Sequence, residues 1–312
     1  MSDHNASAAE VAGAFSSLGI PGFVAVLTAA AARGLSDREI DRAVHVLAAE
    51  DNPSRRLGPA AAEIALSFMP ARGDVDWPTI LPGVDVNVVP VAHRRKRLLI
   101  ADMDSTMIPV ECIDELADMA GVGAEVAAIT ERAMAGELDF EGALTERVAL
   151  LAGAEVALLE RVFAERIALN PGARALVRTM AAAGAHTMLV SGGFTFFTER
   201  VAAVAGFAEN RANTLEMADG RLTGRAVPPI LGRAAKQAAL EEALAALGLT
   251  PAEAMAVGDG ANDLAMVEAA GLGVAFRAKP RLADAADARI DHAGLEALLA
   301  LQGYAADELA AD

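Results

Sequence analysis

Two aspartates separated by one residue stand directly after a short apolar run. Leu98-Leu99-Ile100-Ala101 is followed by Asp102-Met103-Asp104-Ser105-Thr106. Carboxylates serve as nucleophiles in phosphoryl transfer, and on an extended chain two of them point the same way, so that one can attack while the other moves a proton. An Asp-x-Asp pair is also common as a turn or a helix cap. The pair on its own therefore does not establish such chemistry.

A second acidic cluster, Gly258-Asp259-Gly260-Ala261-Asn262-Asp263, also follows an apolar run. Mg²⁺ prefers carboxylate and carbonyl oxygens as ligands and keeps several of its waters. We therefore expect Asp102 and Asp259 to bind Mg²⁺ together, with a phosphate oxygen as a further ligand. The alternative interpretation is a glycine-rich turn capped by Asn262 or Asp263.

Two further features suit the binding of a phosphoryl group. Ser191-Gly192-Gly193 follows a third apolar run and precedes a helix expected near Thr195. A hydroxyl and backbone N–H groups at a helix N-terminus favour a bound phosphate. Lys236 lies in the helical pattern of residues 232–247, where a lysine is usually solvated. In a site crowded with carboxylates it would instead offset phosphate charge.

The elements that carry these residues alternate between strands and helices. The apolar runs are residues 98–101, 187–190, 255–257 and 272–276. This alternation predicts an α/β domain with a doubly wound parallel sheet, in which ligands bind beyond the carboxyl ends of the strands. Asp102, Ser191 and Asp259 are all expected at such ends. The long helical stretch from residue 113 to about 166 predicts a small helical cap beside them.

Residues 1–92 are expected to form a separate α+β domain ahead of the α/β domain at 93–312. The strand candidates in it are residues 23–28, 62–68 and 84–89, and Ser36 with Glu39 three positions later predicts a helix start. No chemically reactive cluster is present in this region, which favours a packing or regulatory role. The basic run at 93–97 is interpreted as a solvated linker.

Composition and charge exclude several function classes. The formal net charge of −17 argues against a nucleic-acid partner, because phosphate backbones need clustered Lys and Arg. No apolar run reaches the ~20 residues of a membrane span, and Met1–Glu10 lacks the basic start and apolar stretch of a secretory signal. Cys112 is the single cysteine, so no intramolecular disulfide can form. We therefore expect a cytoplasmic protein without a membrane partner.

Taken as an ordered set, these motifs resemble those of the haloacid dehalogenase-like phosphatases. The set consists of Asp102-Met103-Asp104-Ser105-Thr106, Ser191, Lys236 and Gly258-Asp259-Gly260-Ala261-Asn262-Asp263. The resemblance covers about the last two thirds of the chain. It implies hydrolysis through an aspartyl-phosphate on Asp102, with Asp104 as general acid and base.

The same resemblance implies roles for the other motif residues. The side chains of Asp102 and Asp259 and the backbone carbonyl of Asp104 would bind Mg²⁺, and Asp263 would orient the waters of the metal. The groups that would stabilise charge on the transferring phosphoryl group are Ser191, the amides near Gly192 and Gly193, and Lys236. Asn262 would help to place substrate or phosphate.

Within this superfamily, the expected cap resembles that of the phosphoserine phosphatases. The resemblance rests on Glu111, Met134, Phe140 and Arg147. O-phosphoserine carries an ammonium and a carboxylate beyond its phosphate; an acid suits the first, and arginine can hold the second by two bonds. The resemblance also implies that Met134 and Phe140 shield the site from water. The alternatives are a surface ion pair between Glu111 and Arg147, and core positions for Met134 and Phe140.

The resemblance implies the last step of serine biosynthesis as the function, with serine as a product inhibitor. The N-terminal region more loosely resembles the ACT-like regulatory domains, which bind amino acids and often pair, so a homodimer is expected. One alternative is a phosphatase for another small phosphate, such as phosphorylated homoserine or a sugar phosphate. Another is a signalling receiver that stores phosphate on an aspartate. The pair Glu111 and Arg147 favours the amino-acid phosphate, and Asp104 with the cap argues against the receiver.

Overall fold

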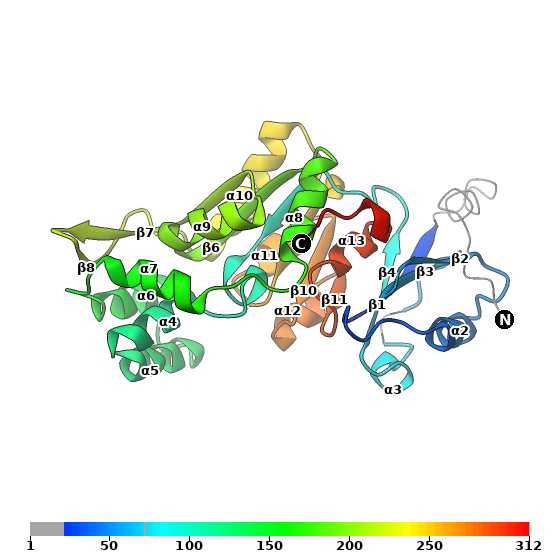
Figure 1. Cartoon of the computed structure of the whole chain (residues 1–312), viewed down its shortest axis with the longest axis horizontal. Helices are drawn as coiled ribbons and strands as arrows, with labels where there is room; N and C mark the ends of the chain where they lie inside the picture. The colour runs from blue at the N-terminus through cyan, green and yellow to red at the C-terminus, as the bar shows by residue number, and fades with distance from the viewer. Residues whose placement is uncertain (1–21, 72, 312) are drawn as a thin grey trace.

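The computed structural model describes residues 22–71 and 73–311 (Figure 1), so Met1–Glu10 and the rest of the first 21 residues lie outside the described part. The larger of its sheets contains β5 Leu98–Ala101, β6 His186–Phe194, β7 Glu209–Ala218, β8 Arg221–Val227, β9 Ala254–Gly258, β10 Leu272–Phe276 and β11 Ala288–Ile290. The strand order is β11-β10-β9-β5-β6-β7-β8. All neighbours are parallel except β7 and β8, so the expected parallel sheet is confirmed.

Helices cover both faces of this sheet. They are α8 Ala173–Ala182, α9 Thr195–Ala205 and α13 Ala297–Leu301 on one face, and α10 Arg233–Leu247, α11 Leu264–Ala269 and α12 Pro280–Ala285 on the other. Successive side chains of a strand point to opposite faces. Leu99 and Ala101 accordingly pack with α8, α9 and α13, whereas Leu98 and Ile100 pack with α10, α11 and α12. An apolar strand such as β5 therefore contributes to two cores at once.

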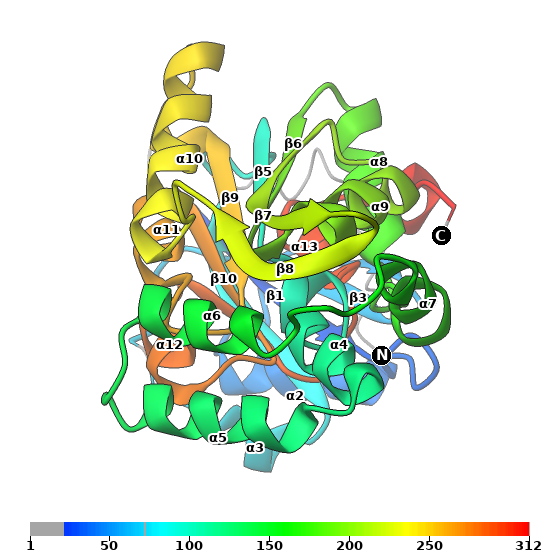
Figure 2. The same ribbon diagram turned by 90° about the vertical axis from the view of Figure 1, so that its left-hand side faces the viewer.

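A group of four helices lies between β5 and α8 in the sequence, as the long helical stretch predicted. They are α4 Cys112–Ala120, α5 Gly123–Met134, α6 Phe140–Ala149 and α7 Ala157–Arg166. Figure 2 shows them, together with the hairpin of β7 and β8, in front of the strand ends. The hairpin turns at Asp219 and Gly220, whose φ angles are 51° and 74°. Positive φ at both central positions is what a two-residue hairpin turn of type I′ requires.

The second sheet belongs to the N-terminal region and is antiparallel, with the strand order β2-β3-β1-β4. Its elements are β1 Phe23–Ala29, α2 Asp37–Val46, β2 Ser54–Gly58, β3 Ala61–Leu66, α3 Trp77–Ile80 and β4 Val84–Pro90. The three expected strands are β1, β3 and β4, and α2 begins with the expected capping box of Ser36 and Glu39. The edge strand β2 has no counterpart among the expected strands.

The basic run at 93–97 is solvated only in part: His93, Arg95 and Arg97 are exposed, as expected of a solvated linker, whereas Arg94 and Lys96 are not. Arg94 pairs with the buried Glu63 of β3 at 2.6 Å and donates to the carbonyl of Leu301 at 2.7 Å. The Arg95 guanidinium lies 4.0 Å from the ring centroid of Tyr304. Lys96 is buried and donates to the carbonyl of Ala252 at 2.7 Å. Arg94 therefore ties the N-terminal region to the α/β part.

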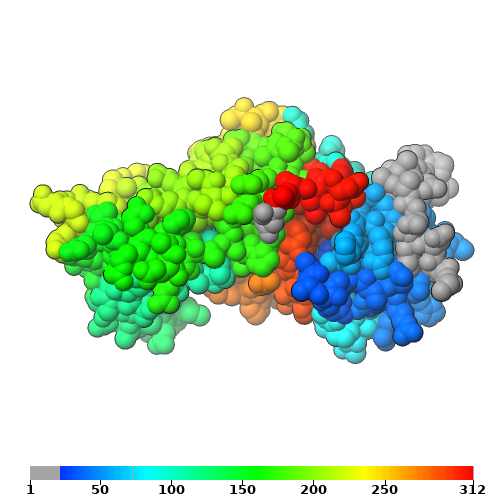
Figure 3. Space-filling model, viewed as in Figure 1, coloured from blue at the N-terminus to red at the C-terminus, as the bar shows by residue number. Residues whose placement is uncertain are grey.

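Side chains of β4 extend this contact to the edge strand β11. Asn87 accepts a hydrogen bond from the backbone N–H of Arg289 and donates one to its carbonyl, at 2.7 and 2.9 Å. Asp85 accepts from the backbone N–H groups of Asp291, His292 and Ala293. Figure 3 shows the segment near residue 300 packed against the N-terminal region. The two sheets are thus joined at their edges through side chains.

The longest helix in the described part of the chain is α10, with 15 residues. Crossing a bilayer takes roughly 20 residues of apolar helix. Within residues 22–71 and 73–311, no helix combines the length and apolar character of a membrane span.

Candidate active site

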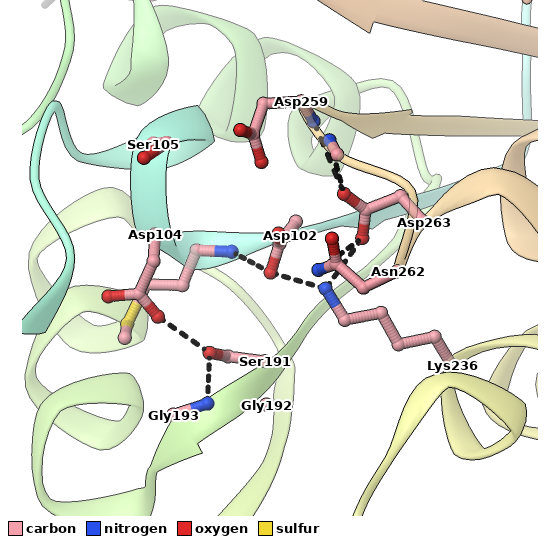
Figure 4. A network of polar contacts seen from close by, with 12 residues as sticks. Asp102, Asp104, Ser105, Ser191, Gly192, Gly193, Lys236, Asp259, Asn262 and Asp263 are labelled. Carbon is pink, nitrogen blue, oxygen red and sulfur yellow. Dashed lines mark hydrogen bonds and ion pairs between the residues drawn. The ribbon is translucent and has the colours of Figure 1, made fainter. Parts of the chain in front are cut away.

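The residues singled out by the motifs meet at one end of the larger sheet (Figure 4). Asp102 directly follows β5 and Asp259 directly follows β9, as expected. Ser191 lies within β6, which continues to Phe194 rather than ending at Val190. The pairing of β6 with β7 shifts register between Val190 and Phe194. The chain at Ser191 therefore leaves the regular ladder, although it remains extended.

Lys236 links two buried carboxylates. Its Nζ lies 2.6 Å from Oδ1 of Asp102 and 2.6 Å from Oδ1 of Asp263. All three side chains are at most 4% exposed. Lys236 sits in α10, so this helix delivers the ammonium from the face of the sheet opposite to α8 and α9. Lys236 is therefore buried, unlike most lysines in the middle of a helix, which are solvated.

Asp263 is held by backbone donors on its other oxygen. Its Oδ2 accepts from the N–H groups of Asp259 and Gly260 at 3.2 and 3.1 Å. A Cβ on Gly258 would lie 2.4 Å from Cγ of Asp263, so this position needs glycine for the close approach. The segment Gly258–Asp263 is therefore a turn folded around the Asp263 carboxylate.

Asp104 lies on the β6 side of Asp102, away from Lys236 and Asp263 (Figure 4). Its Oδ2 accepts from Oγ of Ser191 at 2.9 Å, and its Oδ1 accepts from the N–H of Cys112 at 2.8 Å. The Ser191 hydroxyl in turn accepts from the N–H of Gly193 at 2.8 Å. A Cβ on Gly193 would lie 2.9 Å from Oδ2 of Asp104. The backbone angles of Asp102 and of Asp104 lie in the extended region, but those of Met103 between them do not, so the two carboxylates do not follow one extended strand.

The electrostatics of the site follow from burying several carboxylates together. Burial, with the nearby charge of Asp263, raises the pKa of Asp102 well above its ordinary value, while Lys236 acts in the opposite direction. Burial and Asp263 raise the pKa of Asp259 as well. Burial alone would lower the pKa of Lys236, but Asp102 and Asp263 outweigh it and raise the pKa. Lys236 is therefore a fixed cation.

We expect Lys236→Met to lower the free energy of unfolding by about 3–5 kcal/mol, because it leaves buried carboxylates without their partner. Urea unfolding in the presence of a chelator measures this. Lys279→Met is the matched control, since the Lys279 side chain is 67% exposed and lies 3.9 Å from Asp259. The control should change stability by less than about 0.5 kcal/mol. Equal stabilities for both variants would contradict a structural role for the buried ammonium.

The acidic residues fit a divalent cation by their chemistry and spacing. Oxygen atoms of Asp102, Asp259 and Asp263 all lie within 4.8 Å of one another, and all three residues are buried. Carboxylate oxygens are the ligands that Mg²⁺ prefers. Burial and the nearby charge of Asp263 raise the pKa values of Asp102 and Asp259, and a bound cation would offset this gathered negative charge.

The predicted cap residues occupy different environments. Phe140, the first residue of α6, lies against the glycine loop: a Cβ on Gly192 would be 2.9 Å from Cζ of Phe140. Met134, the last residue of α5, is 78% exposed, so a core position for it is wrong. Glu111 accepts from Oγ of Ser105 at 2.8 Å. Within the described residues, Arg147 makes no ion pair with Glu111 within 4.0 Å, and its Nε donates to the carbonyl of Ala143 at 3.2 Å.

The motifs predicted no role for Ser105 or Lys279, although both side chains lie close to acidic residues of the site. Ser105 adopts a φ of 57°, and this left-handed turn brings its hydroxyl to Glu111. Lys279 follows β10 and approaches Asp259. Their positions in the sequence could have predicted this. Ser105 lies inside the Asp102 motif, and Lys279 follows a parallel strand that ends at the same edge of the sheet.

Comparisons with known proteins agree with this geometry. The family model of haloacid dehalogenase-like hydrolases matches residues 99–268. The phosphoserine phosphatase of Polaromonas sp. is 48% identical over 229 residues, which are 71% of this chain and 97% of that protein. Two other phosphoserine phosphatases are longer, and the aligned regions span 63% and 56% of their lengths.

Solved structures are similar as well. A probable phosphoserine phosphatase from Vibrio cholerae in unliganded form has a TM-score of 0.75 and 33% identity, and the match covers 92% of this chain and 88% of that one. A phospho-aspartyl intermediate analogue of phosphoserine phosphatase has a TM-score of 0.61 and 38% identity, covering 66% and 98% of the two chains. From its motifs, its α/β sheet and these matches, the chain belongs to the haloacid dehalogenase-like hydrolases.

Proposed function

We propose that the protein hydrolyses O-phosphoserine to serine and phosphate through an aspartyl-phosphate on Asp102, as the last step of serine biosynthesis. The observation that carries the proposal is the pairing of Asp102 with the buried Lys236, with the Asp104–Ser191 hydrogen bond alongside. The similarity to phosphoserine phosphatases, one of them solved as a phospho-aspartyl analogue, supports both the substrate and the intermediate.

In the first half of the reaction, a carboxylate oxygen of Asp102 attacks phosphorus, and the bond from phosphorus to the serine oxygen breaks. Asp104 gives its proton to the departing serine oxygen. In the second half, Asp104 takes a proton from water as the water oxygen attacks phosphorus, and the bond to Asp102 breaks. One residue serves both steps because the proton that it loses in the first is regained in the second.

The neighbouring residues stabilise charge on the transferring phosphoryl group. Ser191, the amides at Gly192 and Gly193, and the ammonium of Lys236 surround it, in a region that excludes most water. Asn262 follows Asp259 in the same turn and helps to place the phosphate.

Mg²⁺ is the proposed cofactor, held by the side chains of Asp102 and Asp259 and the backbone carbonyl of Asp104. When bound, it neutralises and orients the phosphate. Asp263 orients the waters of the metal rather than binding it directly. In support, both oxygens of Asp263 already accept hydrogen bonds from Lys236 and from the turn.

Glu111 and Arg147 are proposed to read the amino-acid end of the substrate. Burial, followed by the charge of Asp104, raises the pKa of Glu111 to about 7. Burial lowers the pKa of Arg147, and the nearby charges of Asp114 and Glu111 offset this only in part. Within the described residues no ion pair joins the two side chains, so each is available to the substrate. Phe140 and Met134 are proposed to cover the substrate when the cap closes.

The test is phosphate release from O-phospho-L-serine, with Mg²⁺ and with a chelator. Rapid release that the chelator abolishes supports both the reaction class and the substrate. Release from other phosphates but not from phosphoserine would keep the aspartyl-phosphate mechanism and overturn the roles of Glu111 and Arg147. No release from any phosphate would favour a receiver that stores phosphate.

We expect Arg147→Ala to reduce kcat/KM for phosphoserine by about 10–10²-fold, the scale of losing a charged hydrogen bond of roughly 1.5–3 kcal/mol. The value for p-nitrophenyl phosphate, which has no carboxylate, should change little. Arg132→Ala is the control, because Arg132 also lies in the cap but is exposed and pairs with Glu146. Equal losses on both substrates would show that Arg147 does not read the carboxylate.

For residues 1–92 we propose an ACT-like regulatory domain, and for residues 93–312 the phosphatase domain with its cap at about 113–166.

Serine is proposed as a product inhibitor, and the protein is proposed to be cytoplasmic. Inhibition by serine that competes with phosphoserine would place serine in the active site; a non-competitive pattern would indicate a second site. Homodimer formation stays a prediction, which sedimentation would test.

A further inference from the structure

A buried asparagine behind the site joins two of its backbone segments. Asn213 lies on β7 and is 1% exposed. Its Nδ2 donates to the carbonyl of Gly192 at 2.8 Å and to the carbonyl of Leu231 at 3.2 Å. Its Oδ1 accepts from the N–H of Leu231 at 2.6 Å. Three hydrogen bonds from one neutral side chain therefore link β6 to the segment before α10.

The chemistry of these partners fixes the orientation of the side chain. Two carbonyl oxygens require the two hydrogens of Nδ2, and one N–H requires the oxygen. Turning the amide over would place Oδ1 against two carbonyls and leave the N–H of Leu231 without an acceptor. Asparagine is therefore suited to this position, whereas aspartate and leucine of similar size are not.

Each joined segment carries groups that are proposed to bind the phosphoryl group. Gly192 lies between Ser191 and Gly193. The Ser191 hydroxyl donates a hydrogen bond to Asp104, and it accepts one from the N–H of Gly193. Leu231 lies just before α10, which carries Lys236. The ladder between β6 and β7 is irregular at this point, so the regular strand pairing does not fix Gly192. The side chain of Asn213 instead donates a hydrogen bond to the Gly192 carbonyl, where the pairing of β6 with β7 is interrupted.

We propose that Asn213 is a positioning residue, which sets the distance from the hydroxyl and amides of residues 191–193 to the ammonium of Lys236. The proposal rests on the proposed phosphoryl-transfer function. Asn213 itself touches no reacting atom. Its effect reaches the phosphoryl group, which all substrates share, and not the amino-acid end that Glu111 and Arg147 face. A displacement of about 1 Å in such groups can cost 10²-fold in rate.

The test compares Asn213→Leu with Asn87→Leu. Asn87 is the matched control because it is also a buried asparagine that bonds both backbone groups of one residue, Arg289, but at the joint between the sheets. We expect both variants to lose stability. Only Asn213→Leu should lose kcat/KM, by about 10–10²-fold, and by the same factor for phosphoserine and p-nitrophenyl phosphate. The inhibition constant of orthovanadate, a phosphoryl transition-state mimic, should rise by that factor too.

Several results would overturn the proposal. They are a wild-type kcat/KM for folded Asn213→Leu, an unchanged vanadate constant, or the same kinetic loss in Asn87→Leu. If Asn213→Leu does not fold, Asn213→Ser, which keeps one hydroxyl, is measured instead, and wild-type kinetics in it would likewise reject the proposal. If the wild-type protein hydrolyses p-nitrophenyl phosphate but not phosphoserine, only the proposed substrate is refuted. The role of Asn213 can then still be tested with p-nitrophenyl phosphate.

Discussion

Replacement of Asp102 by asparagine is expected to reduce kcat by at least about 10⁴-fold, the scale on which removal of a covalent nucleophile acts in other enzymes. An amide oxygen is a far weaker nucleophile than a carboxylate, and its geometry still fits. The amide Oδ1 can accept from the N–H of Met103 and from Lys236, as the carboxylate does at 2.8 and 2.6 Å. The variant should therefore fold normally.

The stability of Asp102→Asn separates this loss from unfolding. Since burial and the nearby charge of Asp263 raise the pKa of Asp102, removal of its charge relieves the cost of burying that charge in the metal-free protein. We expect urea unfolding with a chelator to show no loss of stability. In the wild type, borohydride reduction during turnover should convert residue 102 to homoserine, identified by mass spectrometry. Modification at another residue would reject Asp102 as the nucleophile.

Replacement of Asp104 by asparagine is expected to reduce kcat for phosphoserine by about 10²–10⁴-fold, because general acid and base assistance is lost. The side chain can keep its contacts: Oδ1 accepts from the N–H of Cys112, and the new Nδ2 faces the Ser191 hydroxyl. A near-native kcat would exclude Asp104 from proton transfer.

The two steps can be separated with p-nitrophenyl phosphate. Nitrophenolate is a good leaving group and needs little help from an acid, whereas hydrolysis of the aspartyl-phosphate still needs a base. Asp104→Asn should therefore release close to one equivalent of nitrophenolate in a burst and then turn over slowly. Slow release from the first turnover onward would place the defect in the attack on the substrate.

The sequence was sufficient for the parts of the fold that depend on local apolar patterning. β5, β9 and β10 are buried on both faces, so each reads as a continuous apolar run, and the catalytic carboxylates follow two of them. The order of the motifs then identified which residues would meet. Parallel strands end at one edge of a sheet, so residues that are distant in sequence were predicted to be neighbours.

The sequence was not sufficient where charged groups pair across the fold. β2 contains Arg55 and Arg56, which look like surface residues, yet Arg55 bonds the buried Glu63 at 2.7 Å. Arg94 uses the other oxygen of the same Glu63. Such burial depends on partners that are distant in sequence, which no local pattern shows. Asn213 was missed for the same reason, because its partners lie 18 and 21 residues away in two different segments.

The joint between the two sheets has a consequence for how the protein is made. Asp85 and Asn87 bond backbone groups about 200 residues further along the chain, and Val24, Val26 and Val89 share a core with α13. During synthesis the N-terminal sheet emerges first, but α13, which among the described residues packs on one of its apolar faces, leaves the ribosome much later. At 5–20 residues per second, that takes at least about 10 seconds. The nascent chain therefore carries an uncovered apolar sheet face, for which a chaperone is the expected temporary partner.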